Sequence, residues 1–206
     1  RDVLGSRGLG DVYKRQEEIR SHEVNLLLNE TVLELGGDTK VNKVITNKGE
    51  FETDLVILAT GVRPNTEFIT DDRIEKLRNG AIVVDKFGRT SIEDVYSAGD
   101  CATINSYVTE KEAYVPLATG ANKLGRIVGE NLAGQNNSFQ GSLASSCIKV
   151  MNMEAARTGL SEKEVKELGF AYKTKFISDM NQTSYYPGRQ KIYVKLIYLS
   201  LIHISE

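Results

Sequence analysis

The chain has 206 residues, of which 40% are hydrophobic and 26% are charged, a composition typical of a globular protein that can bury a core. The formal net charge of -2 and the pI near 5.9 argue against a nucleic-acid-binding protein, which needs a basic surface to neutralise phosphates. No apolar run approaches the roughly 20 residues that span a bilayer, and no secretory signal is present. We therefore expect a cytoplasmic protein without a membrane or nucleic-acid partner.

The two ends of the chain do not resemble the rest. The first 16 residues show neither helical nor strand periodicity, and residues 199–206 follow a strand-like stretch without turn residues. Both ends look like adaptor sequence translated at the edge of a DNA read. We therefore expect residues 1–16 and 199–206 to be non-native, and we do not take Gly8-Leu9-Gly10 as a nucleotide-binding loop.

The first half of the chain contains several short apolar runs. Turn residues separate these runs, so they predict strands at residues 24–28, 31–35, 41–46 and 50–53. Residues 55–59 are uniformly apolar, which favours a strand covered on both faces, as in the parallel sheet of an α/β protein.

Two further strands are predicted at residues 81–84 and 94–97, before a helix that begins at Pro116. The apolar residues of this helix recur at helical spacing, and Gly134 is suited to end it. They are Leu117, Ala121, Leu124, Val128 and Leu132.

A polar segment at residues 134–142 indicates a domain boundary. Beyond it, residues 143–150 predict a strand. Ser161 and Glu164 form an S-x-x-E capping box before a short helix that Gly169 can end. Strands at residues 170–177 and 192–198 complete a second, smaller α+β unit.

Three motifs carry the chemistry of the chain. They are Ala-Thr-Gly-Val-Arg-Pro-Asn at residues 59–65, the stretch from Thr90 to Asp100 that ends in Ser-Ala-Gly-Asp, and Val-Pro-Leu-Ala-Thr at residues 115–119. Their order and spacing resemble the pyridine nucleotide-disulfide oxidoreductase family, and the resemblance covers most of residues 17–198. It implies an enzyme that binds FAD and a nicotinamide nucleotide, NAD(P)H.

The resemblance also implies a fold and a domain order. The fold is α/β, with partial FAD- and NAD(P)-binding doubly wound domains followed by a truncated α+β dimerisation domain. Residues 17–60 match the end of the NAD(P)-binding domain, and residues 61–134 match the later part of the FAD-binding domain. Residues 142–198 match the start of the dimerisation domain.

Gly99 and Asp100 end a predicted strand, at the sheet edge where open α/β folds bind ligands. Glycine lets a ligand approach the backbone closely, and an ionised carboxylate only accepts hydrogen bonds, which suits a sugar-like hydroxyl. The family resemblance implies that Asp100 holds the ribityl chain of FAD. The alternative is an aspartate that only caps a turn.

The helix that follows Pro116 has free N–H groups and a partial positive charge at its start. The resemblance implies that Leu117, Ala118 and Thr119 face the pyrimidine edge of the flavin, where this charge would stabilise the reduced ring. The contact would be made by the backbone. A helix that only packs is the alternative.

The smaller unit contains the step Tyr-Tyr-Pro-Gly at residues 185–188, which resembles coenzyme A-disulfide reductases and related NADH oxidases. In that group a tyrosine of this step reaches the active site of the partner subunit, so Tyr185 or Tyr186 could assist the disulfide chemistry across a homodimer interface. Both tyrosines could equally be interface packing.

The remaining reactive side chains are interpreted as structural. Arg63 could neutralise a phosphate or pair with a carboxylate, and we favour the second. Cys101 is not the redox cysteine, because the family carries that cysteine in a first flavin segment with no match here. Cys147 lies in a predicted strand and is expected in the core.

The intact parent is expected to transfer electrons from NAD(P)H through FAD to a disulfide, such as coenzyme A disulfide. It could instead reduce oxygen, a peroxide or polysulfide. Neither glycine-rich nucleotide loop is found in residues 17–198, so these residues alone are expected to be inactive. Two other functions stay open: a non-catalytic flavin-binding or dimerisation module, and a flavoprotein that reduces a carrier protein.

Overall fold

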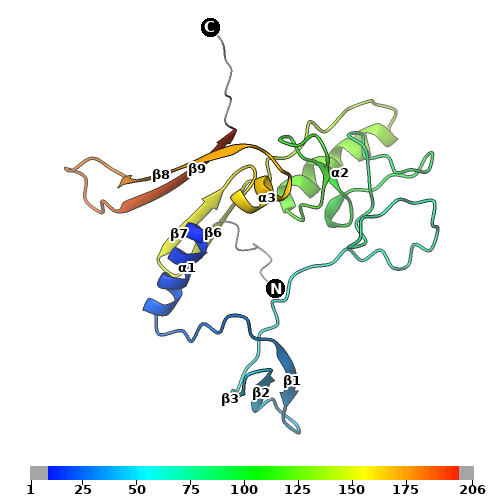
Figure 1. Ribbon diagram of the computed structural model, residues 1–206. Helices are drawn as coiled ribbons and strands as arrows, with labels where there is room; N and C mark the ends of the chain where they lie inside the picture. The colour runs from blue at the N-terminus through cyan, green and yellow to red at the C-terminus, as the bar shows by residue number, and fades with distance from the viewer. Residues whose placement is uncertain (1–8, 200–206) are drawn as a thin grey trace. The chain divides into compact units, whose positions relative to one another are not determined.

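The computed structural model describes residues 9–199 (Figure 1), and it describes side chains from residue 14 on. The chain divides into two compact units, which are described separately. One unit contains the chain up to Val62 together with Cys147–Ala155, and the other contains Arg63–Ser146 and the chain from Ala156 on. The ends expected to be non-native lie in part outside the described residues.

The first unit begins with helix α1, Leu9–Ser21, and continues into a small antiparallel sheet. Strands β1 (Val32–Gly36), β2 (Lys43–Thr46) and β3 (Glu50–Glu52) are hydrogen-bonded in this order. All three were predicted, because turn residues separate them in the sequence. The expectation of no regular structure in the first 16 residues is wrong from Leu9 on, since α1 begins there.

Two predicted strands of the first unit do not form. Residues 24–28 and 55–59 have no strand partner among the described residues. Leu55, Ile57 and Leu58 are 73%, 81% and 72% exposed, so the apolar run is not covered on either face. A strand needs hydrogen-bonding neighbours as well as apolar side chains, and the described part of the first unit supplies none here.

The paired strands β6 (Ser146–Val150) and β7 (Met153–Arg157) follow later in the chain. Asn152, in the turn between them, donates its backbone N–H to Glu18 of α1 at 2.9 Å and lies 3.0 Å from His22 Nε2. These contacts join two distant parts of the first unit. Cys147 was expected in the core, but its side chain is exposed, because it lies on the exposed face of β6, where exposed and partly buried residues alternate.

The second unit has a core of apolar side chains around helix α2, Ala118–Leu132. Two predicted strands are reduced to isolated bridges: Ile82 pairs with Lys76 and Ala102, and Tyr96 pairs with Arg89. Residues 81–84 nevertheless contribute to the core, as their apolar pattern indicates. The buried residues of the core are Ile82, Val84, Ala102, Ile104, Leu124 and Phe139.

Helix α2 begins two residues later than predicted. Leu117 is its N-cap with extended backbone angles, and Pro116 precedes the cap. The helix ends as predicted: Gly134 has φ +88°, its N–H bonds Asn131 O, and the next N–H bonds Glu130 O. This pair of bonds is a Schellman motif, which favours glycine because of its left-handed conformation.

The polar segment after α2 is held against the helix. The buried Asn131 side chain donates to Phe87 O and Asn137 O and accepts from the Asn137 N–H. Phe139 then enters the core. The predicted domain limits stay predictions.

The C-terminal part contains helix α3 (Glu162–Glu167) and the antiparallel strands β8 (Tyr172–Met180) and β9 (Lys191–Leu199). The predicted capping box is present, since Ser161 Oγ accepts from the Glu164 N–H and Glu164 Oε2 accepts from the Ser161 N–H. Gly169, with φ +73°, follows the helix as predicted.

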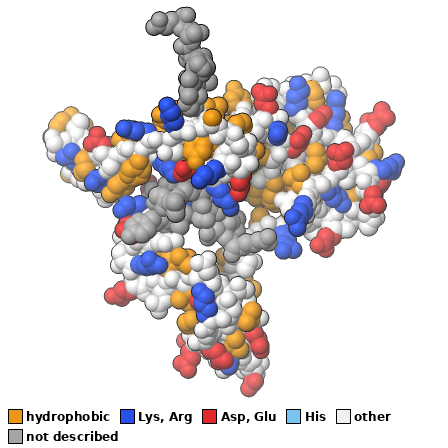
Figure 2. Space-filling model, viewed as in Figure 1, with side chains coloured by type: hydrophobic (Ala, Val, Ile, Leu, Met, Phe, Trp, Pro, Cys, Tyr) orange, Lys and Arg blue, Asp and Glu red, His pale blue; other side chains and the backbone are white. Residues whose placement is uncertain are grey.

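One face of the β8–β9 hairpin is apolar and open. Ile177 pairs with Val194, and because side chains alternate between the faces of a strand, every second pair along the ladder shares their face. Hydrophobic side chains are visible along the hairpin in Figure 2. The apolar residues of this face, each between 44% and 52% exposed, are Ile177, Ile192, Val194, Leu196 and Tyr198.

Candidate functional site

Gly99 and Asp100 begin a short 3-10 turn, η1 (Gly99–Cys101), that leads directly into the core of the second unit. Gly99 has φ +85°, and a Cβ there would meet no atom within 4 Å. The space beside this glycine is therefore open, while its backbone conformation disfavours other residues. Asp100 is exposed, and its carboxylate has no hydrogen bond or ion pair among the described residues.

The core holds this turn in place. Thr103 is 0% exposed, its Oγ1 accepts from the Val84 N–H at 3.1 Å, and its N–H donates to Ile82 O at 2.8 Å. Strand β4 (Ile104–Asn105) follows and pairs with β5 (Glu112–Ala113). The exposed carboxylate of Asp100 is thus followed directly by buried and hydrogen-bonded residues of the core.

The start of α2 belongs to the same unit and packs on η1. A Cβ on Gly120 would lie 3.3 Å from Ile104 Cδ1, so the first turn of the helix lies close to β4. The N–H groups of Ala118 and Thr119 have no acceptor within residues 9–199, and both residues are exposed. No acidic residue occupies the first turn, so the partial positive charge there is not offset locally.

Tyr114 lies between these two elements in the sequence, directly after β5. Its hydroxyl is buried and has no hydrogen-bond partner in the described structure. An orphaned buried hydroxyl costs about 1–3 kcal/mol. Burial raises the pKa of Tyr114, and the nearby charges of Asp100 and Cys101 raise it further. This residue was missed from the sequence, because nothing in the motif marks a hydroxyl as buried.

These groups form a complementary set. An exposed carboxylate accepts hydrogen bonds from hydroxyls, while the two exposed backbone N–H groups donate to acceptors or anions. Gly99 leaves room for a close approach. This donor set fits a ligand that combines a polyhydroxyl chain with an electron-rich ring edge, as FAD does. Asp100 would hold the chain, and the start of α2 would face the ring.

The two tyrosines of the hairpin loop stand apart from this set. Tyr185 and Tyr186 are 80% and 58% exposed, with ring centroids 5.0 Å apart. Neither hydroxyl has a hydrogen-bond partner in the described part of the chain. The structure does not bring them together with Asp100 or α2, and their predicted role across an interface stays a prediction.

Cys101 is partly exposed beside Asp100, and neither it nor Cys147 forms a disulfide. Arg63 is exposed. Among residues with described side chains, no cluster of three or more His, Cys, Asp or Glu could hold a metal ion. No helix of the described chain is long and apolar enough to cross a membrane.

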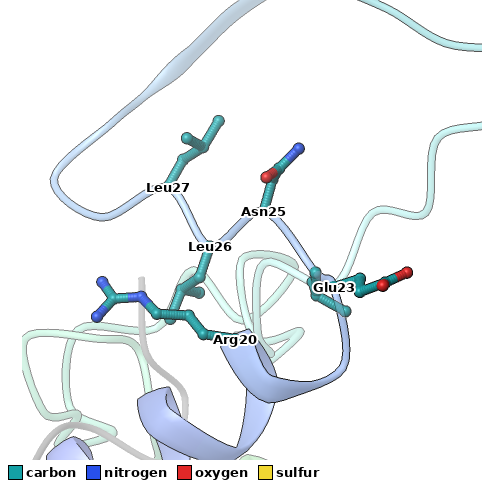
Figure 3. Close-up of a pocket in the computed structure, with 6 residues that line it drawn as sticks. Arg20, Glu23, Asn25, Leu26 and Leu27 are labelled. Carbon is teal, nitrogen blue, oxygen red and sulfur yellow. The ribbon is translucent and has the colours of Figure 1, made fainter.

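A hollow in the first unit lies beside the C-terminal end of α1 (Figure 3). Its side chains point in different directions and do not converge on one point, as the close-up shows. None of the predicted site residues lines it. We therefore do not take it as the functional site. Its lining residues are Arg20, Glu23, Val24, Asn25, Leu26 and Leu27.

Residues 11–125, more than half of the chain, match the model of the pyridine nucleotide-disulphide oxidoreductase family. The chain belongs to this family. The match includes Gly99, Asp100 and the first turn of α2, and it begins inside the stretch set aside as non-native. The family consists of oxidoreductases that use FAD and NAD(P)H.

Similar proteins agree with this assignment. A CoA-dependent NAD(P)H sulfur oxidoreductase of Pyrococcus furiosus is 40% identical over 180 residues, which cover 87% of this chain and 40% of that protein. An NADH oxidase of Enterococcus faecalis is 34% identical over 185 residues, covering 89% of this chain and 41% of the other. The chain thus spans about two fifths of the length of these relatives.

A solved structure has the same fold. The NAD-dependent persulfide reductase from A. fulgidus superposes with a TM-score of 0.85 at 32% identity, covering 94% of this chain and 36% of that one. The α/β fold expected from the sequence is confirmed at this level, as a fold similar to FAD- and NAD(P)-binding oxidoreductases.

Proposed function

We propose that the chain is part of an FAD-dependent NAD(P)H:disulfide oxidoreductase similar to coenzyme A-disulfide reductases. Residues 61–134 would contribute the later part of the FAD-binding domain and residues 17–60 the end of the NAD(P)-binding domain. Residues 142–198 would begin a dimerisation domain of a cytoplasmic homodimer. The family match and the named relatives support this proposal.

The observation that carries the proposal is that the turn with Asp100 packs against the start of α2. The carboxylate of Asp100 accepts hydrogen bonds from the ligand's hydroxyls, and the N–H groups of Ala118 and Thr119 donate to its anionic ring edge. These N–H donors are fixed in place before the ligand binds. They therefore stabilise the negative charge that develops on the flavin ring when it is reduced. FAD, when bound, supplies a two-electron carrier between the nicotinamide and the acceptor.

Tyr185 and Tyr186 are proposed to act at the homodimer interface, where an exposed phenol could donate to a disulfide substrate of the partner subunit. The electron acceptor is a small molecule: a disulfide, or alternatively oxygen, a peroxide or polysulfide. Among the relatives, the sulfur oxidoreductase is in keeping with a sulfur-containing acceptor and the NADH oxidase with oxygen. A non-catalytic flavin-binding or dimerisation module is the second candidate.

FAD binding by the chain tests the proposed site. Asp100→Asn replaces a charged acceptor with a neutral amide, and hydrogen bonds to charged groups contribute about 1.5–3 kcal/mol. We expect the dissociation constant for FAD, measured by quenching of flavin fluorescence, to rise about tenfold or more.

Asp94→Asn is the matched control. Asp94 is exposed in the same motif and has φ +61°, a conformation that asparagine also tolerates. Its variant should bind FAD like the wild type. Equal affinity of the Asp100 and Asp94 variants, or no binding by the wild type, would overturn the proposed site.

A further inference from the structure

The two faces of the β8–β9 hairpin differ in burial. Every partly buried residue of the two strands lies on one face of the ladder, and these residues are Tyr172, Met180, Lys195 and Ile197. Glu162 of α3 accepts hydrogen bonds from Tyr172 and Lys195, so α3 lies on this side of the hairpin. The opposite face is exposed at every position. It carries Ile177 and Val194, and we call it the open face.

The open face has an apolar centre and opposite charges at its two ends. Ile177 and Val194 form the central pair. Lys173 and Lys175 share this face on one side of Ile177, and Asp179 shares it on the other side. No ion pair among the described side chains neutralises these three charges. Lys175 and Asp179 are each two residues from Ile177, so the charge pattern is balanced about the central pair.

This pattern is complementary to itself. A twofold axis through the central pair, at right angles to the strands, makes the strands of two facing copies antiparallel. Lys175 of each copy then faces Asp179 of the other, and the apolar centres meet. The long lysine side chain can cross the roughly 10 Å that separate packed sheets. Two copies with parallel strands would instead place lysine against lysine, which is unfavourable.

We propose that the open face is a docking surface for a second copy of the chain, with the two hairpins packed face to face about a twofold axis near Ile177. The inference rests on the proposed function for the homodimer and adds the surface and the charge pairing that form it. Burial of the exposed apolar side chains supplies the favourable free energy of association. The charges at the two ends select the antiparallel orientation.

Substitutions in the apolar centre test the surface. Ile177→Asp and Val194→Asp each place an unpaired charge where the contact is buried, so each should raise the dissociation constant of the dimer about tenfold or more. Sedimentation velocity of the full chain over a range of concentrations measures this constant. Ser178→Asp introduces the same charge at the next residue of β8, on the other face, and should leave the constant unchanged. Both central residues are about half exposed in one copy, so the variants should fold, which circular dichroism checks.

Charge reversal tests the pairing without changing the apolar centre. Lys175→Glu places a glutamate against Asp179 of the partner copy, and Asp179→Lys places a lysine against Lys175. Each variant alone should dimerise roughly tenfold more weakly than the wild type, because the contact occurs twice in a twofold dimer. An equal mixture of the two variants should dimerise like the wild type, since both contacts in the mixed dimer then join opposite charges.

Recovery of the dimer in the mixture, together with weaker dimers in both central variants, supports the proposal. A wild type that stays monomeric at every concentration overturns it, as does a dimer that neither central variant weakens. Weakening by Ile177→Asp alone also overturns it, because only β8 would then lie in the contact. A mixture that stays monomeric overturns the charge pairing. Assembly beyond the dimer overturns the twofold contact, which closes on itself.

FAD binding by the same wild-type sample reports separately on the proposed function. A chain that binds FAD and stays monomeric overturns the contact through the open face and leaves the flavin site in place. A chain that dimerises as expected and binds no FAD supports the contact and overturns the proposed flavin site.

Discussion

Around α2, apolar side chains are buried, whereas along the β8–β9 hairpin they face solvent. Leu124 is 1% exposed in the core, while Leu196 on the hairpin is 52% exposed. The hairpin is fixed instead by polar contacts to α3, where Glu162 accepts hydrogen bonds from Lys195 and Tyr172. Both regions belong to one compact unit, yet different forces hold them.

The difference explains where the candidate site lies. The apolar core joins Asp100 and the start of α2. The free energy gained by burying its apolar side chains is large and does not depend on pH. The hairpin that presents Tyr185 and Tyr186 depends on one short helix with a capping box and one ion pair. A ligand-binding donor set needs the first kind of support, while the hairpin's exposed apolar face is suited to a partner surface.

Substitution of Leu124 should have the largest effect. Leu124→Ala removes a fully buried side chain from the core, which costs about 2–5 kcal/mol because a cavity remains. Hydrogen exchange of the α2 amides measures this loss. Leu196→Ala, the same change on the hairpin, should cost less than about 1 kcal/mol. Equal losses in the two variants would contradict the contrast between the regions.

Removing the helix cap should have an intermediate effect. Ser161→Ala deletes the oxygen that accepts from the Glu164 N–H at 3.2 Å, which costs about 1 kcal/mol. The loss should appear as faster hydrogen exchange in α3 and should leave α2 unchanged. Ser184→Ala, an exposed serine in the hairpin loop, is the control. Faster exchange in α2 as well would mean that the two regions are not independent.

Local features of the fold were predictable from the sequence. The capping box at Ser161 and the helix ends at Gly134 and Gly169 form as expected, because each depends on a few neighbouring residues. The strand at residues 55–59 was wrong, because a strand also needs partners distant in the sequence. Strand β8 extends to Met180, past the predicted end at 177, because its pairing with β9 continues through Ser178 and Asp179.

The candidate site was predictable in part. The motif ending in Gly99-Asp100 and the start of α2 were recognised from their order and spacing, and the structure places them in one unit. Tyr114 was missed, although it stands just before the Val-Pro-Leu-Ala-Thr motif. Its hydroxyl is buried and has no hydrogen-bond partner in the described structure, and a sequence does not reveal this property because it arises from packing. A tyrosine between a strand and a helix start is the only signal in the sequence.

The smallest predicted effect is a pH dependence confined to the hairpin. Hydrogen bonds from Lys195 and, less strongly, from Tyr172 hold the pKa of Glu162 below its ordinary value of 4.5. A lowered pKa in the folded state stabilises the protein above the unfolded value and loses this effect as the pH falls. The hairpin should therefore weaken as the pH drops below about 4.5. Solvent screens the pair, so the loss should not exceed about 1 kcal/mol.

Hydrogen exchange of the β8 and β9 amides against pH measures this loss, with α2 as the internal reference. Glu162→Gln should remove the pH dependence, because its side chain no longer titrates. Glu167→Gln is the matched control on the same helix, since Glu167 is 62% exposed and pairs only loosely with Lys163 at 3.6 Å. If α2 lost protection over the same pH range, a shared titration would act on both regions. The separation between an apolar core and a polar-anchored hairpin would then fail.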